Sequence, residues 1–113
     1  MVLKKFNFKY KGKKYEVEVK ECKSILQKTS GLMFRKNSLA LLFVYKRLVR
    51  EPIHSFFCIP FIAIWFDGDK VVDVQFVKGW KLNIKPKQKF DKFLEIPENS
   101  EIFPEILDGK ENI

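Results

Sequence analysis

The stretch Asp67-Gly68-Asp69-Lys70-Val71-Val72-Asp73-Val74-Gln75-Phe76-Val77 decides the fold. After the turn residues Asp67-Gly68-Asp69, apolar side chains alternate with polar ones, which is typical of a strand with one buried face. The segment Ser55–Phe66, which includes the apolar run Ile59–Phe66 and for which we expect a bend at Pro60, comes directly before the turn. Two such runs joined by a short turn that contains Asp and Gly predict a β-hairpin.

Two further segments show strand patterns. Phe6–Tyr10 and Tyr15–Lys20 both alternate with a period of two, and the Gly-containing segment Lys11–Lys14 lies between them, so this region predicts a second β-hairpin. Leu39–Tyr45 is apolar almost throughout, which favours a strand covered on both faces. Between Tyr15–Lys20 and Leu39–Tyr45, residues 23–29 have the pattern of a short polar helix that ends near Gly31.

The C-terminal third predicts shorter elements. Trp80–Ile84 and Phe90–Ile96 have the composition of strands, and residues 102–107 can form one short turn that packs on the sheet before the chain end frays. About seven short strands with one or two small helices predict a mainly β fold, a small antiparallel β-barrel-like domain. A chain of 113 residues fits a single domain over 1–113, with a partly frayed acidic segment at 98–113.

Charge is unevenly distributed along the chain. Residues 1–94 carry 21 Lys and Arg against 8 Asp and Glu, a net charge of +13, whereas residues 95–113 carry one Lys against six acids, a net charge of −5. A basic protein of this kind can attract nucleic acid. Because 19 of the 22 cations are lysines spread along strands, solvated strand faces explain the charge better than nucleic-acid binding does.

The sequence gives no sign of a membrane segment, a metal site or a cofactor. No apolar run approaches the ~18 residues of a membrane helix, and the N-terminus lacks the apolar core of a signal peptide, so we expect a cytoplasmic protein. Cys22 and Cys58 form no C-x-x-C pair, and His54 is the single histidine, which argues against structural zinc. We expect both thiols to be reduced, and the oligomeric state stays open.

Gly31-Leu32-Met33-Phe34-Arg35 belongs to a set of motifs that extends over roughly residues 17 to 97. The others, in order, are the apolar strand Leu39–Tyr45, His54-Ser55-Phe56-Phe57-Cys58, the apolar strand Ile62–Phe66, the turn Asp67-Gly68-Asp69, and Val71-Val72-Asp73. Together they resemble an uncharacterised bacterial and archaeal family, the domain-of-unknown-function family numbered 192. The resemblance implies a compact β-rich, barrel-like domain and no established activity.

The sequence departs from that family pattern at two positions. Cys58 stands where members usually have Met, and Ala63 stands where they usually have Asp. If that Asp serves catalysis or metal binding in relatives, this chain lacks the function, which weakens any prediction of an enzyme.

The candidate site residues are Arg35, Arg47, Arg50 and His54, which include every arginine and the sole histidine. Arginine presents a planar fork suited to carboxylate or phosphate. If their segments meet at one end of the barrel, they form an anion pocket. The sequence therefore predicts a non-catalytic domain that binds a small anionic or polar ligand, although Arg35 can instead hold its turn through an ion pair.

Two alternatives remain. One is a basic module that associates with nucleic acid or ribonucleoprotein, for which Tyr10, Tyr15 and Trp80 are candidate exposed aromatics. The other is an enzyme that uses His54, whose ordinary pKa lies near neutrality. Strand alternation places Ser55 on the opposite face from His54, and no orienting acid stands out, so we predict no catalytic residues. Asp67 and Asp69 are typical turn residues rather than metal ligands.

Overall fold

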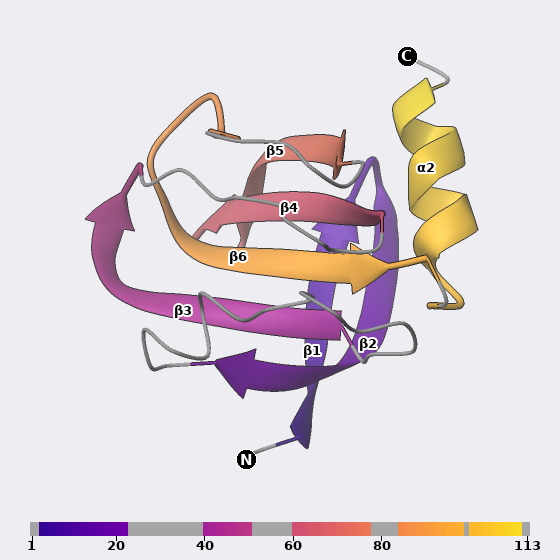
Figure 1. Cartoon of the computed structure of the whole chain (residues 1–113), viewed down its shortest axis with the longest axis horizontal. Coiled ribbons are helices and arrows are strands. Elements are labelled where there is room, and N and C mark those ends of the chain that lie inside the picture. Colours follow the sequence, from indigo (N-terminus) through magenta and orange to yellow (C-terminus); the bar gives the residue numbers. More distant parts are fainter. Residues whose placement is uncertain (1–2, 23–39, 51–59, 78–83, 99, 112–113) are drawn as a thin grey trace.

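The structure, a computed structural model, describes residues 3–22, 40–50, 60–77, 84–98 and 100–111 (Figure 1). Within them six strands form one sheet in the order β1-β2-β3-β6-β4-β5. The strands are β1 (Leu3–Tyr10), β2 (Lys13–Cys22), β3 (Ala40–Val49), β4 (Phe61–Asp67), β5 (Lys70–Val77) and β6 (Phe90–Pro97), and the helix is α2 (Phe103–Glu111). The predicted mainly β, barrel-like fold is therefore confirmed.

The sheet curls into a half-barrel that stays open between its two outermost strands. β1 comes close to β5, but the two are not neighbours in the hydrogen-bonded order. Neighbouring strands are antiparallel except for β2 and β3, which run parallel. The parallel pair differs from the predicted antiparallel barrel. Residues 23–39 separate the two strands in the sequence, and a connection of this length allows the chain to cross over and start β3 in the same direction as β2.

Both predicted hairpins are present. The β1–β2 turn places Lys11 and Gly12 at φ values of 50° and 78°, the pattern of a type I′ turn, which requires a positive φ at both central residues. In the β4–β5 turn Gly68 has a φ of 62°, as the first turn position of type II′ requires. With these positive φ values, the backbone twist of each turn matches the twist of the two strands that it connects.

Other predictions differ in extent or lie outside the described residues. β3 continues beyond the predicted Tyr45 to Val49, and α2 has nine residues where the sequence predicts one short turn. The predicted helix at 23–29 falls outside the described residues, and so does the predicted strand Trp80–Ile84 apart from its last residue. That residue, Ile84, is buried. Among the described residues, no helix is long and apolar enough to span a membrane.

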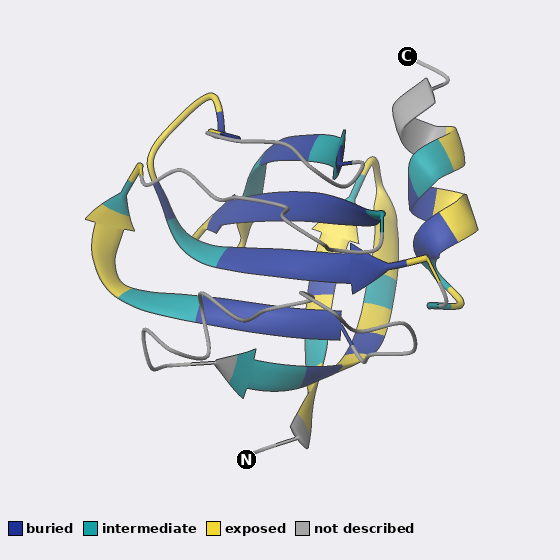
Figure 2. Ribbon diagram, viewed as in Figure 1, coloured by how far each residue is buried: buried dark blue, intermediate teal, exposed yellow. Residues whose placement is uncertain are grey.

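Two hydrophobic cores lie on opposite faces of the sheet. The inner face of the half-barrel carries a cluster that joins β1, β2 and α2 to the central strands, in which Phe8 and Phe6 pack on Phe66. The outer face carries a second, mainly aromatic cluster: Leu41, Phe43, Phe61, Ala63, Trp65, Val77, Ile84, Phe90 and Phe93. Because β4 and β6 are covered on both sides, their ribbons are almost continuously buried, whereas β3 is buried only from Ala40 to Phe43 (Figure 2).

The start of β3 shows how one strand serves both cores. Ala40 and Leu42 belong to the inner cluster, whereas Leu41 and Phe43 belong to the outer one, and all four are buried. This confirms the predicted strand with two covered faces. Burial of each large side chain contributes roughly 1.5–3 kcal/mol, so the two cores hold the fold together.

Helix α2 lies beside the end of the half-barrel at which β6 finishes (Figure 1). Phe103 and Ile106 enter the inner cluster, where Phe103 meets the ring of Phe76 edge-on at 5.9 Å. An exposed ion pair from Lys13 Nζ to Glu105 Oε2, 2.6 Å long, adds a link to β2. Since exposed pairs contribute at most about 1 kcal/mol, apolar packing rather than charge holds the helix in place.

We expect the β1–β2 turn to respond in opposite directions to two substitutions. Lys11→Asn should raise the free energy of unfolding by roughly 0.5–1 kcal/mol, because Asn tolerates a positive φ better than Lys. Gly12→Ala should lower it by about 1 kcal/mol or more, because alanine is strained at a φ of 78°. Urea denaturation measures both, and equal stability of the two variants would contradict the turn geometry.

Candidate functional site

Exposed cations gather at one end of the half-barrel, which we call the basic end. It consists of Lys46, Arg47 and Arg50 from the end of β3 and Lys85, Lys87 and Lys89 from the segment before β6, all exposed. Val49 pairs with Phe90, which brings the two segments together. Figure 1 shows the end of β3 and the loop before β6 on the same side of the molecule.

Arg50 is fixed at the basic end by the loop. Its Nε donates a hydrogen bond to the carbonyl oxygen of Pro86 at 3.0 Å. The loop is in turn held by β5, because the buried Asp73 carboxylate accepts hydrogen bonds from Lys87 N and Gln75 Nε2, both at 3.0 Å. Gln75 Nε2 also donates to Lys85 O at 2.8 Å. The guanidinium of Arg50 is therefore bonded to a loop, residues 85–87, that hydrogen bonds to β5 hold in place.

Among the described residues at this end, the acidic side chains lie on β6 or in the β4–β5 turn rather than on β3. Asp67 and Asp69 flank Gly68 in the β4–β5 turn. Asp91 Oδ1 accepts from Gly68 N at 3.1 Å and lies 3.7 Å from Lys92 Nζ, which also donates to Gly68 O at 2.9 Å. Asp91 and Lys92 thus hold the turn, and the β3 side of the sheet keeps its positive charge.

The structure places two of the four predicted site residues. Arg47 and Arg50 lie at the basic end, whereas Arg35 and His54, together with Ser55 and Cys58, lie outside the described residues. Predictions that involve them, including the alternative of an enzyme using His54, therefore stay predictions. The three lysines of the loop were not predicted as site residues, because only the pairing of β3 with β6 reveals that they adjoin Arg50.

Glu95 is a second unusual feature and lies in the middle of the sheet. Its register partners are Leu41 on β3 and Ala63 on β4, so it faces the outer, aromatic side. The residue is only 6 % exposed, and Oε2 has no hydrogen-bond partner among the described residues. Burial raises the pKa of the Glu95 carboxyl to about 8, so it is mostly protonated at neutral pH.

Trp65 provides an unpartnered donor on the same face. Its ring is fully buried and stacks on Phe93 with a centroid distance of 5.2 Å and an interplanar angle of 17°. Within the described part of the chain, its Nε1–H has no acceptor. A buried polar group without a partner lowers the stability of the folded state by roughly 1–3 kcal/mol, so Trp65 and Glu95 are both destabilising.

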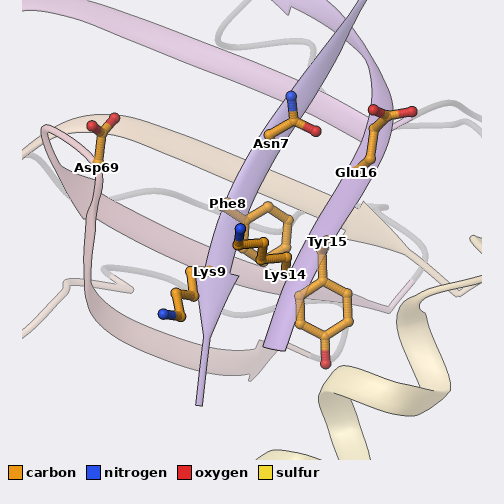
Figure 3. A pocket seen from close by; sticks show the side chains of 7 residues that line it. All are labelled: Asn7, Phe8, Lys9, Lys14, Tyr15, Glu16 and Asp69. Carbon is orange, nitrogen blue, oxygen red and sulfur yellow. The ribbon is translucent and has the colours of Figure 1, made fainter. Parts of the chain in front are cut away.

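A shallow hollow of about 450 Å³ lies against the β1–β2 hairpin (Figure 3). Lys9 and Lys14, which are cross-strand neighbours, line it together with Glu16 and with Asp69 of the β4–β5 turn. Glu16 also pairs with Lys5 at 3.6 Å. Because its charges are of both signs, the hollow is less suited to an anion than the basic end.

Comparison with known proteins gives the family. A UPF0127 protein of Pyrococcus horikoshii is 34 % identical over 91 residues, which cover 77 % of this chain and 78 % of the relative. The chain belongs to the UPF0127 family. A second UPF0127 protein, from Pyrococcus furiosus, is 30 % identical over the same share of each chain. The prediction of an uncharacterised family is thereby confirmed at that level, and no family model matches the chain.

A solved structure from Sinorhizobium meliloti, a protein proposed to regulate transcription, has the same fold as this UPF0127 chain. Its TM-score is 0.70 at 15 % identity, and the match covers 80 % of this chain and 76 % of the other. At that identity the likeness shows the fold alone. Within the described residues, no group of three or more His, Cys, Asp or Glu side chains could hold a metal ion.

We expect the buried Glu95 to make stability depend on pH. The carboxyl has its ordinary pKa of 4.5 when unfolded and about 8 when folded, so the unfolded state loses its proton first as pH rises. Stability should therefore fall between pH 5 and pH 7 by on the order of 2–3 kcal/mol, at ~1.4 kcal/mol for each pH unit.

The isosteric variant Glu95→Gln should remove this part of the pH dependence. Urea denaturation at several pH values measures the difference from the native protein, and Glu98→Gln, which changes an exposed carboxyl, is the control. A wild-type curve parallel to that of Glu95→Gln would show that Glu95 ionises normally.

Proposed function

We propose that the protein is a non-catalytic cytoplasmic domain that binds a small anionic or polar ligand at the basic end. The observation that carries the proposal is the convergence of six exposed cations from two segments far apart in the sequence. Arg47 and Arg50 are the proposed contacts among the described residues, and Arg35 and His54 complete the proposed site. The G-L-M-F-R resemblance to the family numbered 192 agrees with a binder that has no established activity.

Arg50 is the best-prepared of these contacts. The bond from its Nε to Pro86 O restricts the orientation of the guanidinium before a ligand arrives. A planar, pre-oriented guanidinium is suited to the paired oxygens of a carboxylate or phosphate. The surrounding lysines raise the local concentration of anions and increase the rate of encounter. Selectivity would thus come from arginine and attraction from lysine.

A nucleic acid is the second candidate ligand for the same surface. Six cations at one end could contact several phosphates, and the Sinorhizobium meliloti protein with this fold is proposed to regulate transcription. The two tyrosines that the sequence suggested as exposed aromatics for nucleic-acid binding give this second candidate little support. Tyr10 and Tyr15 are half-buried on the β1–β2 hairpin, and Lys13 Nζ lies 5.5 Å from the ring centre of Tyr15.

We expect Arg50→Ala to weaken anion binding about tenfold, because a hydrogen bond to a charged group is worth roughly 1.5–3 kcal/mol. Calorimetric titration with inorganic phosphate, citrate and ATP measures the affinity. Lys14→Ala removes one positive charge from the hairpin instead and should change it less than about twofold, since exposed charges at a distance are screened. Equal losses in both variants would show that only net charge matters.

Salt dependence separates the two candidate ligands. Each phosphate contact of a nucleic acid adds about 0.9 to the slope of log affinity against log salt. A slope of several units for a short DNA duplex, with no measurable binding of the three small anions, would favour the nucleic-acid reading over the small-ligand one.

A further inference from the structure

β1 is an edge strand of the half-barrel, and its free edge lies toward β5. The order of the sheet gives β1 a single hydrogen-bonded neighbour, β2. β1 and β5 come close without pairing, and the described residues make no backbone hydrogen bond to the free edge of β1. An edge of this kind can bind an extended chain through backbone hydrogen bonds.

The β1–β2 turn determines which groups of β1 point to the free edge. In a type I′ hairpin the residues on either side of the turn, here Tyr10 and Lys13, form a hydrogen-bonded pair. Such pairs alternate with pairs that exchange no hydrogen bond, and Asn7 and Lys9 belong to the second kind. Their backbone N–H and C=O groups therefore point away from β2 and can bond a ligand beside β1.

The hollow of about 450 Å³ lies over this part of β1. Its polar lining consists of exposed residues: Asn7, Lys9, Lys14 and Glu16 of the hairpin, and Asp69 of the β4–β5 turn. The hairpin residues share the outer face, because Phe8 and Tyr15 between them pack in the inner cluster. A volume of several hundred Å³ is ordinary for a small-molecule site.

Lys9 and Lys14 form a like-charged pair on this face. They are cross-strand neighbours, and in a pair without hydrogen bonds the side chains lie closest together. Like charges directly opposite each other destabilise a sheet. Neither ammonium has an ion-pair partner among the described residues. A carboxylate between them would bond both and remove their repulsion.

A carboxylate without an ion pair lies at the other end of the hollow. Figure 3 shows Asp69 near the level of Asn7, on the side of β1 away from β2, whereas Lys9 and Lys14 lie further toward the hairpin turn. Within the described part of the chain Asp69 makes no ion pair, whereas Glu16 is already paired with a lysine of β1 at 3.6 Å. The hollow is therefore positive at one end and negative at the other.

We propose that this hollow binds a short zwitterionic peptide of two or three residues, extended along the free edge of β1 and parallel to it. The C-terminal carboxylate of the peptide lies between Lys9 and Lys14, and its amino group faces Asp69. Its amides bond the backbone groups of Asn7 and Lys9. The proposal is independent of anion binding at the basic end, because the two sites share no residue.

Length and charge both select this class of ligand. Asn7 and Lys9 are two positions apart, which is about 7 Å along a strand at roughly 3.4 Å per residue, further than the two charges of a single amino acid reach. An ion of one sign would be repelled at one end of the hollow. An internal segment of a protein could pair with β1 but lacks the two terminal charges that match the ends.

Nuclear magnetic resonance of the ¹⁵N-labelled full chain, titrated with trialanine, tests the proposal. We expect saturable shifts of the Asn7 and Lys9 amide signals. N-acetyl-trialanine lacks the positive end, and trialanine amide lacks the negative end. Each should bind about tenfold more weakly than trialanine, because each loses a hydrogen bond between charged groups.

Two variants assign the two ends of the peptide. Lys14→Ala should weaken trialanine binding about tenfold and lose most of the preference for trialanine over its amide. Asp69→Asn should lose most of the preference for trialanine over the acetylated peptide. Lys46→Ala, at the basic end, and Asp67→Asn, in the same turn as Asp69, remove the same charges outside the hollow. These controls should change the affinity less than about twofold, since exposed charges at a distance are screened.

Three outcomes would overturn the proposal. Absence of saturable shifts at Asn7 and Lys9 would show that the edge of β1 binds no peptide. Equal affinity of the free and blocked peptides would refute recognition of the two termini. Equal losses in the variants and their controls would show that only net charge matters. Anion binding at Arg50 is measured with phosphate, citrate and ATP, so either proposal can fail while the other stands.

Discussion

The insertion of β6 between β3 and β4 is the constraint on which the rest of the structure depends. β6 is the last strand in the sequence, yet it is one of the central strands of the sheet. It pairs with Leu41–Val44 on one side and with Phe61–Phe66 on the other. Without it, the N-terminal strands and the β4–β5 hairpin would be two separate sheets, and neither hydrophobic core would be complete. Because these pairings are long-range in sequence, we infer that the sheet closes late in folding.

Both the basic end and the buried position of Glu95 follow from this insertion. The pairing of Val49 with Phe90 brings the lysine-bearing loop beside Arg50 and creates the basic end. The pairing of Glu95 with Leu41 and Ala63 holds a carboxyl in the centre of the aromatic face. One strand therefore positions an exposed cationic surface at its beginning and a buried acid near its end. The two features differ in cost, since solvated lysines are nearly neutral for stability whereas a buried unpartnered acid is not.

Local patterns were sufficient for the elements and insufficient for their arrangement. The turn glycines Gly12 and Gly68 and the period-two alternation identified both hairpins, because hairpins are determined by neighbouring residues. The parallel pairing of β2 with β3 and the central place of β6 depend on contacts between distant segments, which leave no local pattern. Glu95 was counted with the acidic C-terminal residues for the same reason. Flanked by Leu94 and Ile96, it looks like one polar position in an amphipathic strand, and only its register with two apolar neighbours shows that both faces are covered.

The most direct test of this arrangement is the titration of one carboxyl group. In protein labelled with ¹³C at the glutamate side-chain carboxyl, nuclear magnetic resonance follows each Glu signal against pH, and Glu95→Gln identifies the Glu95 signal by its loss. If β6 is inserted as described, we expect the Glu95 midpoint near pH 8. A midpoint near the ordinary value of 4.5 would place Glu95 in solvent and contradict the central position of its strand.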